Sequence, residues 1–167
     1  MIDGKTVAIV PGSFDPITYG HIDIAKRAAK DYDIVYLAVM INDQKRYLFT
    51  LQEREEIARL ALSGIENITV ISSDGMLWKL AEELGADAIV KGYRNNVDYE
   101  YEMKMAEFNS MHNPKARTVL LKADQSLTTL SSTLLREKIA KSESIDEYLP
   151  KPAANKIIDI LKKRETK

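Results

Sequence analysis

The chain has 167 residues, a formal net charge of -1 and no cysteine. It can therefore form no disulfide, thiolate nucleophile or sulfur metal site, and it lacks the basic excess that is typical of nucleic-acid binding. We expect one domain over residues 1–167. No apolar run approaches the ~18 residues of a membrane span, and residues 1–5 do not resemble a secretory signal. The sequence thus predicts a cytoplasmic protein without nucleic-acid or membrane partners.

Short β-branched runs alternate with longer helical patterns along almost the whole chain. This pattern predicts strands at residues 6–10, 34–40, 68–71, 88–90 and 118–121. It predicts helices at residues 22–30, 51–62, 76–84, 98–111, 131–141 and 152–163. Thr50 and Glu53 have the spacing of a capping box, and Gly85 is typical of a helix end. The alternation favours an α/β fold in which a doubly wound, five-stranded parallel sheet is covered on both faces.

The first predicted strand leads into the sequence PGSFDPITYGH at residues 11–21. A strand, a tight turn and a helix opening bring backbone N–H groups and a ring nitrogen together, as phosphate binding requires. With Thr18 as N-cap, His21 takes the third helical position, where the helix dipole favours a neutral imidazole. Gly20 leaves room for a ligand near the backbone. From these residues alone, His21 fits an ordinary helix position equally well.

Five blocks in chain order resemble the phosphopantetheine adenylyltransferases, a family of the nucleotidylyltransferase superfamily with a (T/H)-x-G-H motif after the first strand. The blocks are residues 11–21, 45–50, 91–94, 98–103 and 130–133. The resemblance covers roughly residues 5–161 and implies a Rossmann-like fold. It also implies that the 4′-phosphate of phosphopantetheine attacks the α-phosphorus of ATP, which gives dephospho-coenzyme A and pyrophosphate in coenzyme A biosynthesis. The G-x-G-x-x-G and G-x-x-x-x-G-K-[ST] phosphate loops are absent after the first strand.

The resemblance assigns catalytic roles to four residues. It implies that His21 stabilises the transition state, that Ser13 touches both reactants, and that Lys45 binds the phosphate of phosphopantetheine. Arg94 would reach the ATP phosphates. The nucleophile is already an anion, so the chemistry requires positioning and charge stabilisation rather than a general base. The residues alone do not separate Lys45 from its neighbour Arg46.

The implied ligand contacts extend over several segments. For ATP they are Ser13, Phe14, Gly20, His21, Gly92, Tyr93, Arg94, Glu102, Leu127, Thr128, Thr129, Leu130, Ser131, Ser132 and Thr133. For phosphopantetheine they are Ser13, Lys45, Leu77 and Lys91. By pattern alone, Leu77 is a core leucine, residues 131–133 are an ordinary helix cap, and Asp98 and Glu100 are acidic residues that favour a helix N-terminus.

No carboxylate cluster has metal-ligand spacing, so the family's Mg²⁺ is expected to bind mainly through ATP phosphates. We expect Asp15 to order its turn by bonding its own backbone, and His112 to be structural. The resemblance also implies binding of coenzyme A.

The predicted helix at residues 98–111 carries two apolar rows on nearly opposite sides. They are Tyr99, Met103 and Ala106, and Tyr101, Met105 and Phe108. A helix on one face of a sheet needs only one such row, so the second predicts contact with another subunit. The alternative is that the chain's own carboxyl-terminal elements cover this second row. The family resemblance implies a homohexamer of two trimers.

Two other functions compete with this interpretation. A nicotinate-mononucleotide adenylyltransferase or a cytidylyltransferase would share the first motif, but these relatives commonly have a second histidine where this chain has Thr18. They also differ around residues 98–103. The second competing function is that of a catalytically idle nucleotide-binding module. The argument against it is the joint presence of Ser13, His21, Lys45 and Arg94.

Overall fold

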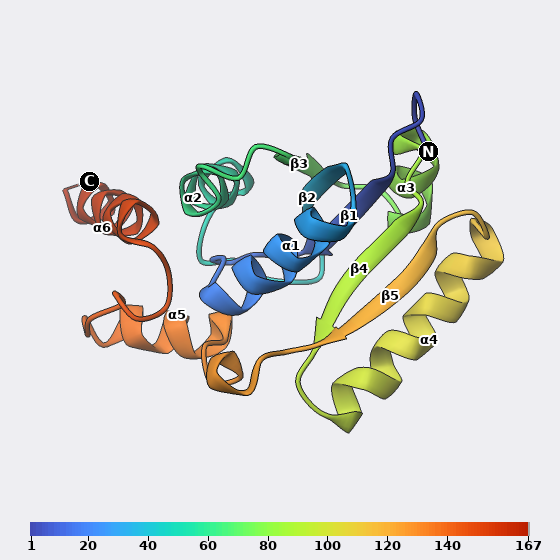
Figure 1. Ribbon diagram of the computed structural model, residues 1–167. Coiled ribbons are helices and arrows are strands. Elements are labelled where there is room, and N and C mark those ends of the chain that lie inside the picture. The colour runs from blue at the N-terminus through green and yellow to red at the C-terminus, as the bar shows by residue number, and fades with distance from the viewer. Residues whose placement is uncertain (167) are drawn as a thin grey trace.

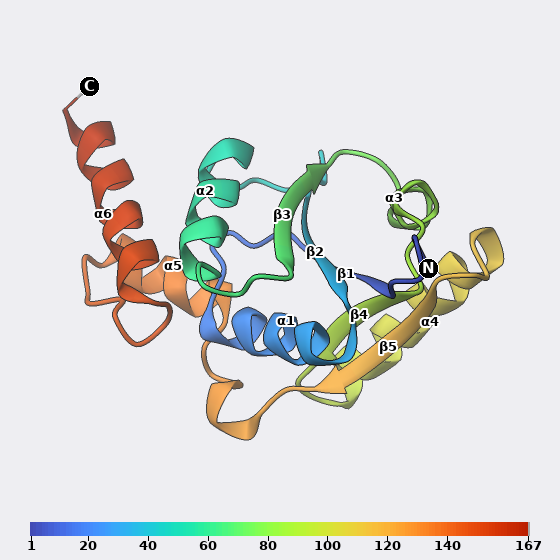
Figure 2. The same ribbon diagram turned by 45° about the horizontal axis from the view of Figure 1, so that its top comes forward.

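The structure is a computed structural model that describes residues 1–166. Five parallel strands form one sheet in the order β3-β2-β1-β4-β5, with helices on both faces (Figures 1 and 2). The strands are β1 (Val7–Gly12), β2 (Ile34–Met40), β3 (Ile68–Ser73), β4 (Ala88–Tyr93) and β5 (Arg117–Lys122). The helices are α1 (Tyr19–Asp31), α2 (Leu51–Ala61), α3 (Leu77–Leu84), α4 (Asn96–His112), α5 (Ser132–Ala140) and α6 (Lys151–Glu165), with a short 3₁₀ turn η1 (Gln125–Leu127). The predicted doubly wound α/β fold is confirmed.

Every predicted element is present, and the differences lie at the ends. Strand β1 continues through Pro11 and Gly12, because these residues pair with Ala38 and Val39 of β2. Proline and glycine are poor signals for a strand interior, so the prediction ended at residue 10. The η1 turn was not predicted.

The sheet separates two apolar layers because successive strand residues point to opposite faces. Ala8 and Val10 join the layer formed by α1, α2, α5 and α6. Val7 and Ile9 join the smaller layer, to which α3 contributes Leu80 and Ala81. The burial of both faces explains the continuous apolar run in β1.

The strands β1 and β4 stop pairing well before their carboxyl ends. Strand β1 pairs with β4 only at Ala8 and Ile9, whereas its pairing with β2 continues to Gly12. The chain order also reverses here, since β2 and β3 lie on one side of β1 and β4 and β5 on the other. Such a switch point, at the carboxyl ends of parallel strands, is where α/β sheets bind ligands.

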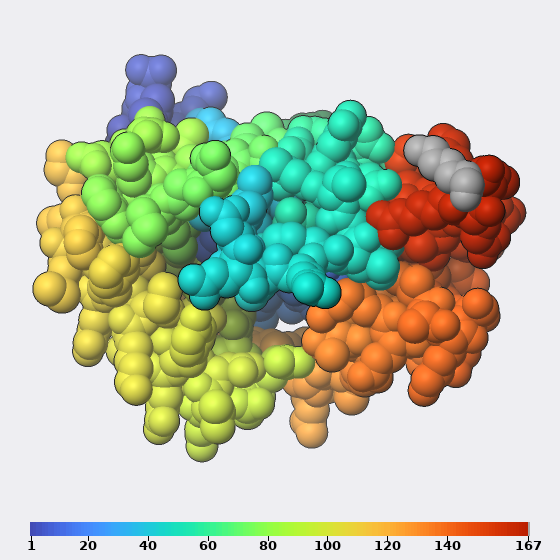
Figure 3. All heavy atoms as spheres, turned by 180° about the vertical axis from the view of Figure 1, so that it is seen from behind, coloured from blue at the N-terminus to red at the C-terminus, as the bar shows by residue number. Residues whose placement is uncertain are grey.

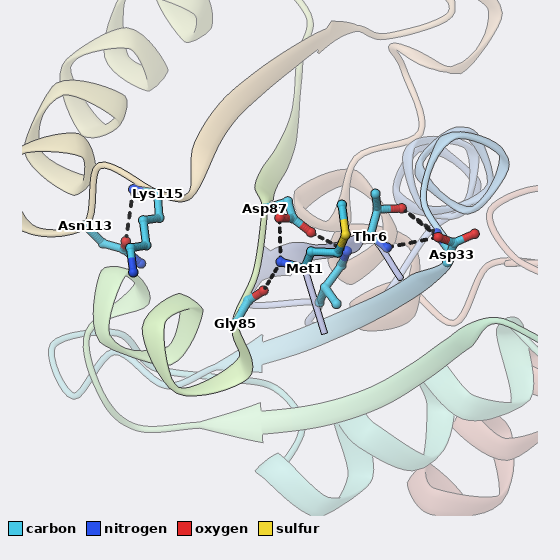
Figure 4. A network of polar contacts seen from close by, with 8 residues as sticks. Met1, Thr6, Asp33, Gly85, Asp87, Asn113 and Lys115 are labelled. Atoms are coloured by element: carbon cyan, nitrogen blue, oxygen red, sulfur yellow. Dashed lines mark hydrogen bonds and ion pairs between the residues drawn. The ribbon is translucent and has the colours of Figure 1, made fainter. Parts of the chain in front are cut away.

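Two carboxylates anchor the amino-terminal end of β1 (Figure 4). Asp33 accepts hydrogen bonds from the N–H and hydroxyl of Thr6 at 2.9 and 3.1 Å. Asp87 accepts from the N–H of Val7 at 2.8 Å and pairs with the amine of Met1 at 2.6 Å. The bonds from Thr6 lower the pKa of the Asp33 carboxyl, and those from the amine and Val7 lower the pKa of Asp87.

Candidate active site

A cleft of about 590 Å³ opens at the carboxyl ends of β1 and β4. Figure 3 shows the molecule hollowed between the yellow-green α4, the cyan segment near residue 45 and the orange segment before α5. The cleft is lined by nearly all residues that the family resemblance implied: Ser13, Phe14, Gly20, His21, Lys45, Leu77, Lys91, Gly92, Tyr93, Arg94, Glu102, Leu127, Thr128, Leu130, Ser131, Ser132 and Thr133. Thr129 is exposed and is not part of this lining.

The turn after β1 has a tightly packed backbone. Phe14 is buried and has a left-handed φ of 47°, a conformation that costs a non-glycine residue energy and clusters at functional sites. A Cβ on Gly12 would lie 2.9 Å from the Phe14 ring. Glycine at residue 12 therefore allows the ring to lie over the backbone, where it contacts the His21 ring edge to face at 5.1 Å.

Three side chains from later elements bond the carbonyls of this turn. They are Arg54 to Ser13 at 2.8 Å, Arg136 to Asp15 at 2.9 Å and Ser132 to Pro16 at 2.7 Å. The donors come from α2 and α5, so two distant helices fix the turn before any ligand arrives. Such preorganisation of donors and backbone is what positioning chemistry requires.

Asp15 acts at longer range than expected. Its buried carboxylate accepts hydrogen bonds from the N–H groups of Leu48 and Phe49 at 2.8 and 3.0 Å. The prediction that it bonds its own backbone is wrong, because the side chain turns inward to the segment that precedes α2. It thereby connects the turn after β1 to the end of the segment that carries Lys45.

His21 is held in one neutral form. The N–H of Thr18 donates to His21 Nδ1 at 3.0 Å, so Nδ1 is the acceptor and the ring proton lies on Nε2. Burial and, to a smaller extent, the charge of the Arg94 guanidinium together lower the pKa of His21 to about 4. His21 occupies the third position of α1 with Thr18 as N-cap, as predicted. Sequence analysis attributed the neutral ring to the helix dipole, whereas burial is the larger cause here.

Gly20 lines the cleft next to His21. A Cβ there would come no closer than 3.5 Å to the nearest atom, the Thr18 Oγ1, which is an ordinary contact. The protein itself therefore does not require glycine at residue 20. We still predict that glycine at residue 20 leaves room for a ligand that approaches the backbone.

Ser13 and Lys45 lie next to each other on one wall of the cleft. Lys45 Nζ lies 3.5 Å from Ser13 Oγ, at the long limit of a hydrogen bond. Arg46 does not line the cleft, so of the two neighbours only Lys45 reaches it. Met40 and Asn42 also line this wall. Sequence analysis missed both, since an apolar strand end and a loop asparagine carry no distinctive signal.

The opposite wall carries two ion pairs. Lys91 Nζ contacts the buried Glu102 Oε2, and Arg94 Nε lies 3.2 Å from Asp98 Oδ2. Asp98 lines the cleft together with Tyr101, and sequence analysis missed both as site residues. Its assignment of Asp98 to the start of a helix is confirmed, but the carboxylate also orients Arg94. The spacing of four residues between them was the available signal.

The segment before α5 brings hydroxyl groups to the same cleft. Ser131 caps α5 by accepting from the N–H of Leu134 at 3.1 Å, and Thr133 Oγ1 accepts from Arg136 at 3.3 Å. Ser132 already donates to the β1 turn. The hydroxyls therefore have structural partners, and the backbone N–H groups of the first turn are the donors that this segment can offer to an anion.

The cleft offers no ready carboxylate cage for a metal. Within residues 1–166, no three His, Asp or Glu side chains gather closely enough to hold an ion, and Asp98 and Glu102 are already paired with cations. His112 lies outside this lining, against the rings of Trp78 and Phe108. No helix among the described residues is long and apolar enough to span a membrane.

Comparisons with known proteins identify the family. The family model described as cytidylyltransferase-like matches residues 9–138. Two curated relatives are the phosphopantetheine adenylyltransferases of Caldanaerobacter subterraneus, 41% identical over 94% of this chain and 98% of the relative, and Heliobacterium modesticaldum, 43% identical over 87% and 86%. A solved structure of Plasmodium falciparum nicotinic acid mononucleotide adenylyltransferase, complexed with APC, has a TM-score of 0.61 over 93% of this chain and 96% of that one. At 17% identity it shows only a common fold. The chain therefore belongs to the phosphopantetheine adenylyltransferases, nucleotidyltransferases of coenzyme A biosynthesis.

Proposed function

We propose that the cleft binds ATP and 4′-phosphopantetheine side by side and joins them directly. An oxygen of the 4′-phosphate attacks the α-phosphorus, the bond from that phosphorus to the bridging oxygen breaks, and pyrophosphate leaves with dephospho-coenzyme A as product. No proton has to be removed from the nucleophile. The observation that carries this proposal is the neutral His21, held with its remaining proton on Nε2 in a cleft rich in cations.

The proposed roles follow the two walls of the cleft. Ser13 and Lys45 bind the attacking phosphate from the side of β1 and β2, where they lie 3.5 Å apart. Arg94 meets the ATP phosphates from the β4 side, and Asp98 holds its guanidinium in place. His21, on α1 between these walls, donates from Nε2 to the charge that develops on the transferred phosphoryl group.

The remaining contacts divide between the two reactants. For ATP we propose Phe14, Gly20, residues 92–93, Glu102 and residues 127–133, of which only Thr129 lies outside the cleft lining. Leu77 lines the cleft at the start of α3 and would meet the pantetheine arm. Lys91 would keep a positive charge near the substrate phosphate, although Glu102 holds it in an ion pair.

We propose that Mg²⁺ arrives with ATP. The carboxylates of the cleft are paired with cations, so phosphate oxygens and water would be its main ligands, as is usual for this ion. When bound, it offsets negative charge on the triphosphate.

The proposed reaction is tested by pyrophosphate release from ATP in the presence of candidate acceptors. We expect release that depends on added 4′-phosphopantetheine and is accompanied by equal formation of dephospho-coenzyme A. Equal release with nicotinate mononucleotide would favour the rival adenylyltransferase instead. No release with either acceptor would favour an idle nucleotide-binding module. Binding of coenzyme A at the same cleft would appear as competition with phosphopantetheine.

We also propose that residues 1–167 form a single nucleotidylyltransferase domain that assembles into a homohexamer. Supporting the first point, α6 packs its buried face into the same apolar layer as α2. The second is supported by α4, where both predicted apolar rows have exposed members, among them Tyr101 and Met103. The alternative cover of α4 by carboxyl-terminal elements finds no support, since α6 lies on the far side of the molecule (Figure 1). Cytoplasmic location remains a prediction.

The assembly is tested by replacing an exposed residue of α4 with a charge. Met103 is 41% exposed, and Met103→Glu should lower the molar mass measured by light scattering at micromolar concentration. Ile158→Glu is the matched control, because Ile158 is equally exposed but lies on α6. A monomeric wild-type protein would contradict the proposed assembly.

A further inference from the structure

Arg54 is a buried cation beside the cleft to which the reaction described above gives no role. It lies on α2 with 2% of its surface exposed, in the same buried stripe as Ile57 and Ala58. Among the described residues no carboxylate lies within ion-pair distance of it, and its Nε has no hydrogen-bond partner. Burial of an unpaired charge is costly, so packing alone does not explain an arginine at this position.

The guanidinium connects the two segments that carry the proposed phosphate ligands. Its Nη1 donates to the carbonyl of Ser13 at 2.8 Å and to that of Met40 at 3.2 Å. Ser13 lies in the turn after β1, and Met40 is the last residue of β2, directly before the segment that holds Lys45. A single planar group thus sets the spacing between these two parts of the cleft wall.

Tyr47 extends this connection to the backbone around Lys45. The guanidinium of Arg54 lies over the Tyr47 ring, 3.9 Å from its centroid. The Tyr47 hydroxyl accepts from the N–H of Asn42 at 2.8 Å, and the carbonyl of Asn42 accepts from the N–H of Lys45 at 2.9 Å. Each step from Arg54 to Lys45 is therefore a direct contact.

We propose that Arg54 is a positioning residue that holds Ser13 and Lys45 at the separation at which one phosphate group can contact both. Their polar atoms lie 3.5 Å apart, and Arg54 itself is not part of the cleft lining. It acts through its neighbours, so the proposal rests on the roles proposed above for Ser13 and Lys45.

A double-mutant cycle between Arg54→Lys and Lys45→Met tests the proposal, with kcat/KM for 4′-phosphopantetheine as the main readout. Lysine keeps the charge, but an ammonium group lacks the planar guanidinium that covers the Tyr47 ring while its Nη1 donates to both carbonyls. We expect Arg54→Lys to lower this kcat/KM about 10- to 100-fold, as small misplacements of reacting groups do. The KM for ATP should change by less than about twofold, because this residue does not hold ATP.

Introducing Arg54→Lys into the Lys45→Met protein distinguishes a positioning role from a purely structural one. In the Lys45→Met protein, adding Arg54→Lys should lower kcat/KM by less than about a further threefold, because one of the two groups whose separation it sets is gone. A purely structural arginine would reduce the active fraction by the same factor in both backgrounds without changing KM, and that result overturns the proposal. The matched control is Arg59→Lys on the exposed face of the same helix, which should leave all constants unchanged.

The remaining outcomes distinguish this proposal from the proposed function. An unaffected Lys45→Met protein overturns the role of Lys45 and this proposal with it, whereas an unaffected Arg54→Lys beside an impaired Lys45→Met overturns this proposal alone. Should Arg54→Lys fail to fold, Tyr47→Leu removes both the ring under Arg54 and the bond to Asn42. The same non-additive loss with Lys45→Met is expected, and an equal loss in both backgrounds overturns the proposal.

Discussion

Lowering the pH through 6.5 should leave His21 uncharged, although an ordinary histidine gains a proton in that range. Burial, the larger cause, and the nearby Arg94 guanidinium together lower the pKa of His21 from 6.5 to about 4. Replacing that cation by Arg94→Met should therefore raise the pKa of His21. The value should stay well below 6.5, because burial, the larger cause, remains.

The size of the effect follows from the pKa. One pKa unit corresponds to about 1.4 kcal/mol, so lowering from 6.5 to about 4 corresponds to roughly 3 kcal/mol between the two protonation states. In the unfolded chain His21 binds a proton below pH 6.5, whereas in the folded protein it does so only near pH 4. The unfolded state thus binds more protons in this window, and the free energy of unfolding should fall as pH falls through it.

Nitrogen NMR of the ring atoms gives the measurement, because the chain has only two histidines and His112→Gln assigns them. Between pH 8 and pH 5, the His21 nitrogens should keep the shifts of a neutral ring protonated at Nε2, and Arg94→Met should move its titration upward. A His21 titration near 6.5, or a proton on Nδ1, would refute the account of how Thr18 and burial hold the ring.

Three further predictions concern the scaffold. Asp33→Asn should lower the Tm at pH 7. Because the pKa of the folded carboxyl is lowered from 3.8, the stabilisation is lost as pH falls through that lowered pKa, and a difference in Tm from wild type that does not narrow with falling pH would count against it. Asp15→Asn should lower the free energy of unfolding, measured in urea, by about 1–3 kcal/mol, because it weakens two buried hydrogen bonds. An unchanged free energy of unfolding would contradict this. Ile157→Ala should lower the free energy of unfolding by about 2–5 kcal/mol. Ile158→Ala should lower it much less, since Ile157 is fully buried and Ile158 is 40% exposed. Equal losses would argue against the packing of α6.

Much of the fold was predictable because its signals are local. The continuous apolar residues of β1 and β2 indicated strands buried on both faces. Thr50 and Glu53 form the expected capping box, and Gly85 ends α3 in the left-handed conformation. Strand ends that contain glycine or proline were less predictable, because pairing with a neighbouring strand determines where β1 and β4 stop.

The site was predictable where one motif or one sheet edge gathers its residues. The carboxyl ends of parallel strands meet at one edge, which brings the blocks after β1, β2 and β4 together. The supporting contacts were not predictable, because Asp15 bonds residues more than thirty positions away and Arg54 reaches across 41 positions to Ser13. The one available sign was that Arg54 continues the apolar stripe of Ile57 and Ala61.

The most direct test of the central claim is the turnover of His21→Ala with ATP and 4′-phosphopantetheine, measured together with the Kd for ATP. A donor that acts in the transition state contributes roughly 3 kcal/mol, which corresponds to a loss of turnover of about 100-fold or more. We expect that loss while the fold and the Kd for ATP stay close to those of the wild type. An unchanged turnover number would contradict the role of His21 and the mechanism built on it.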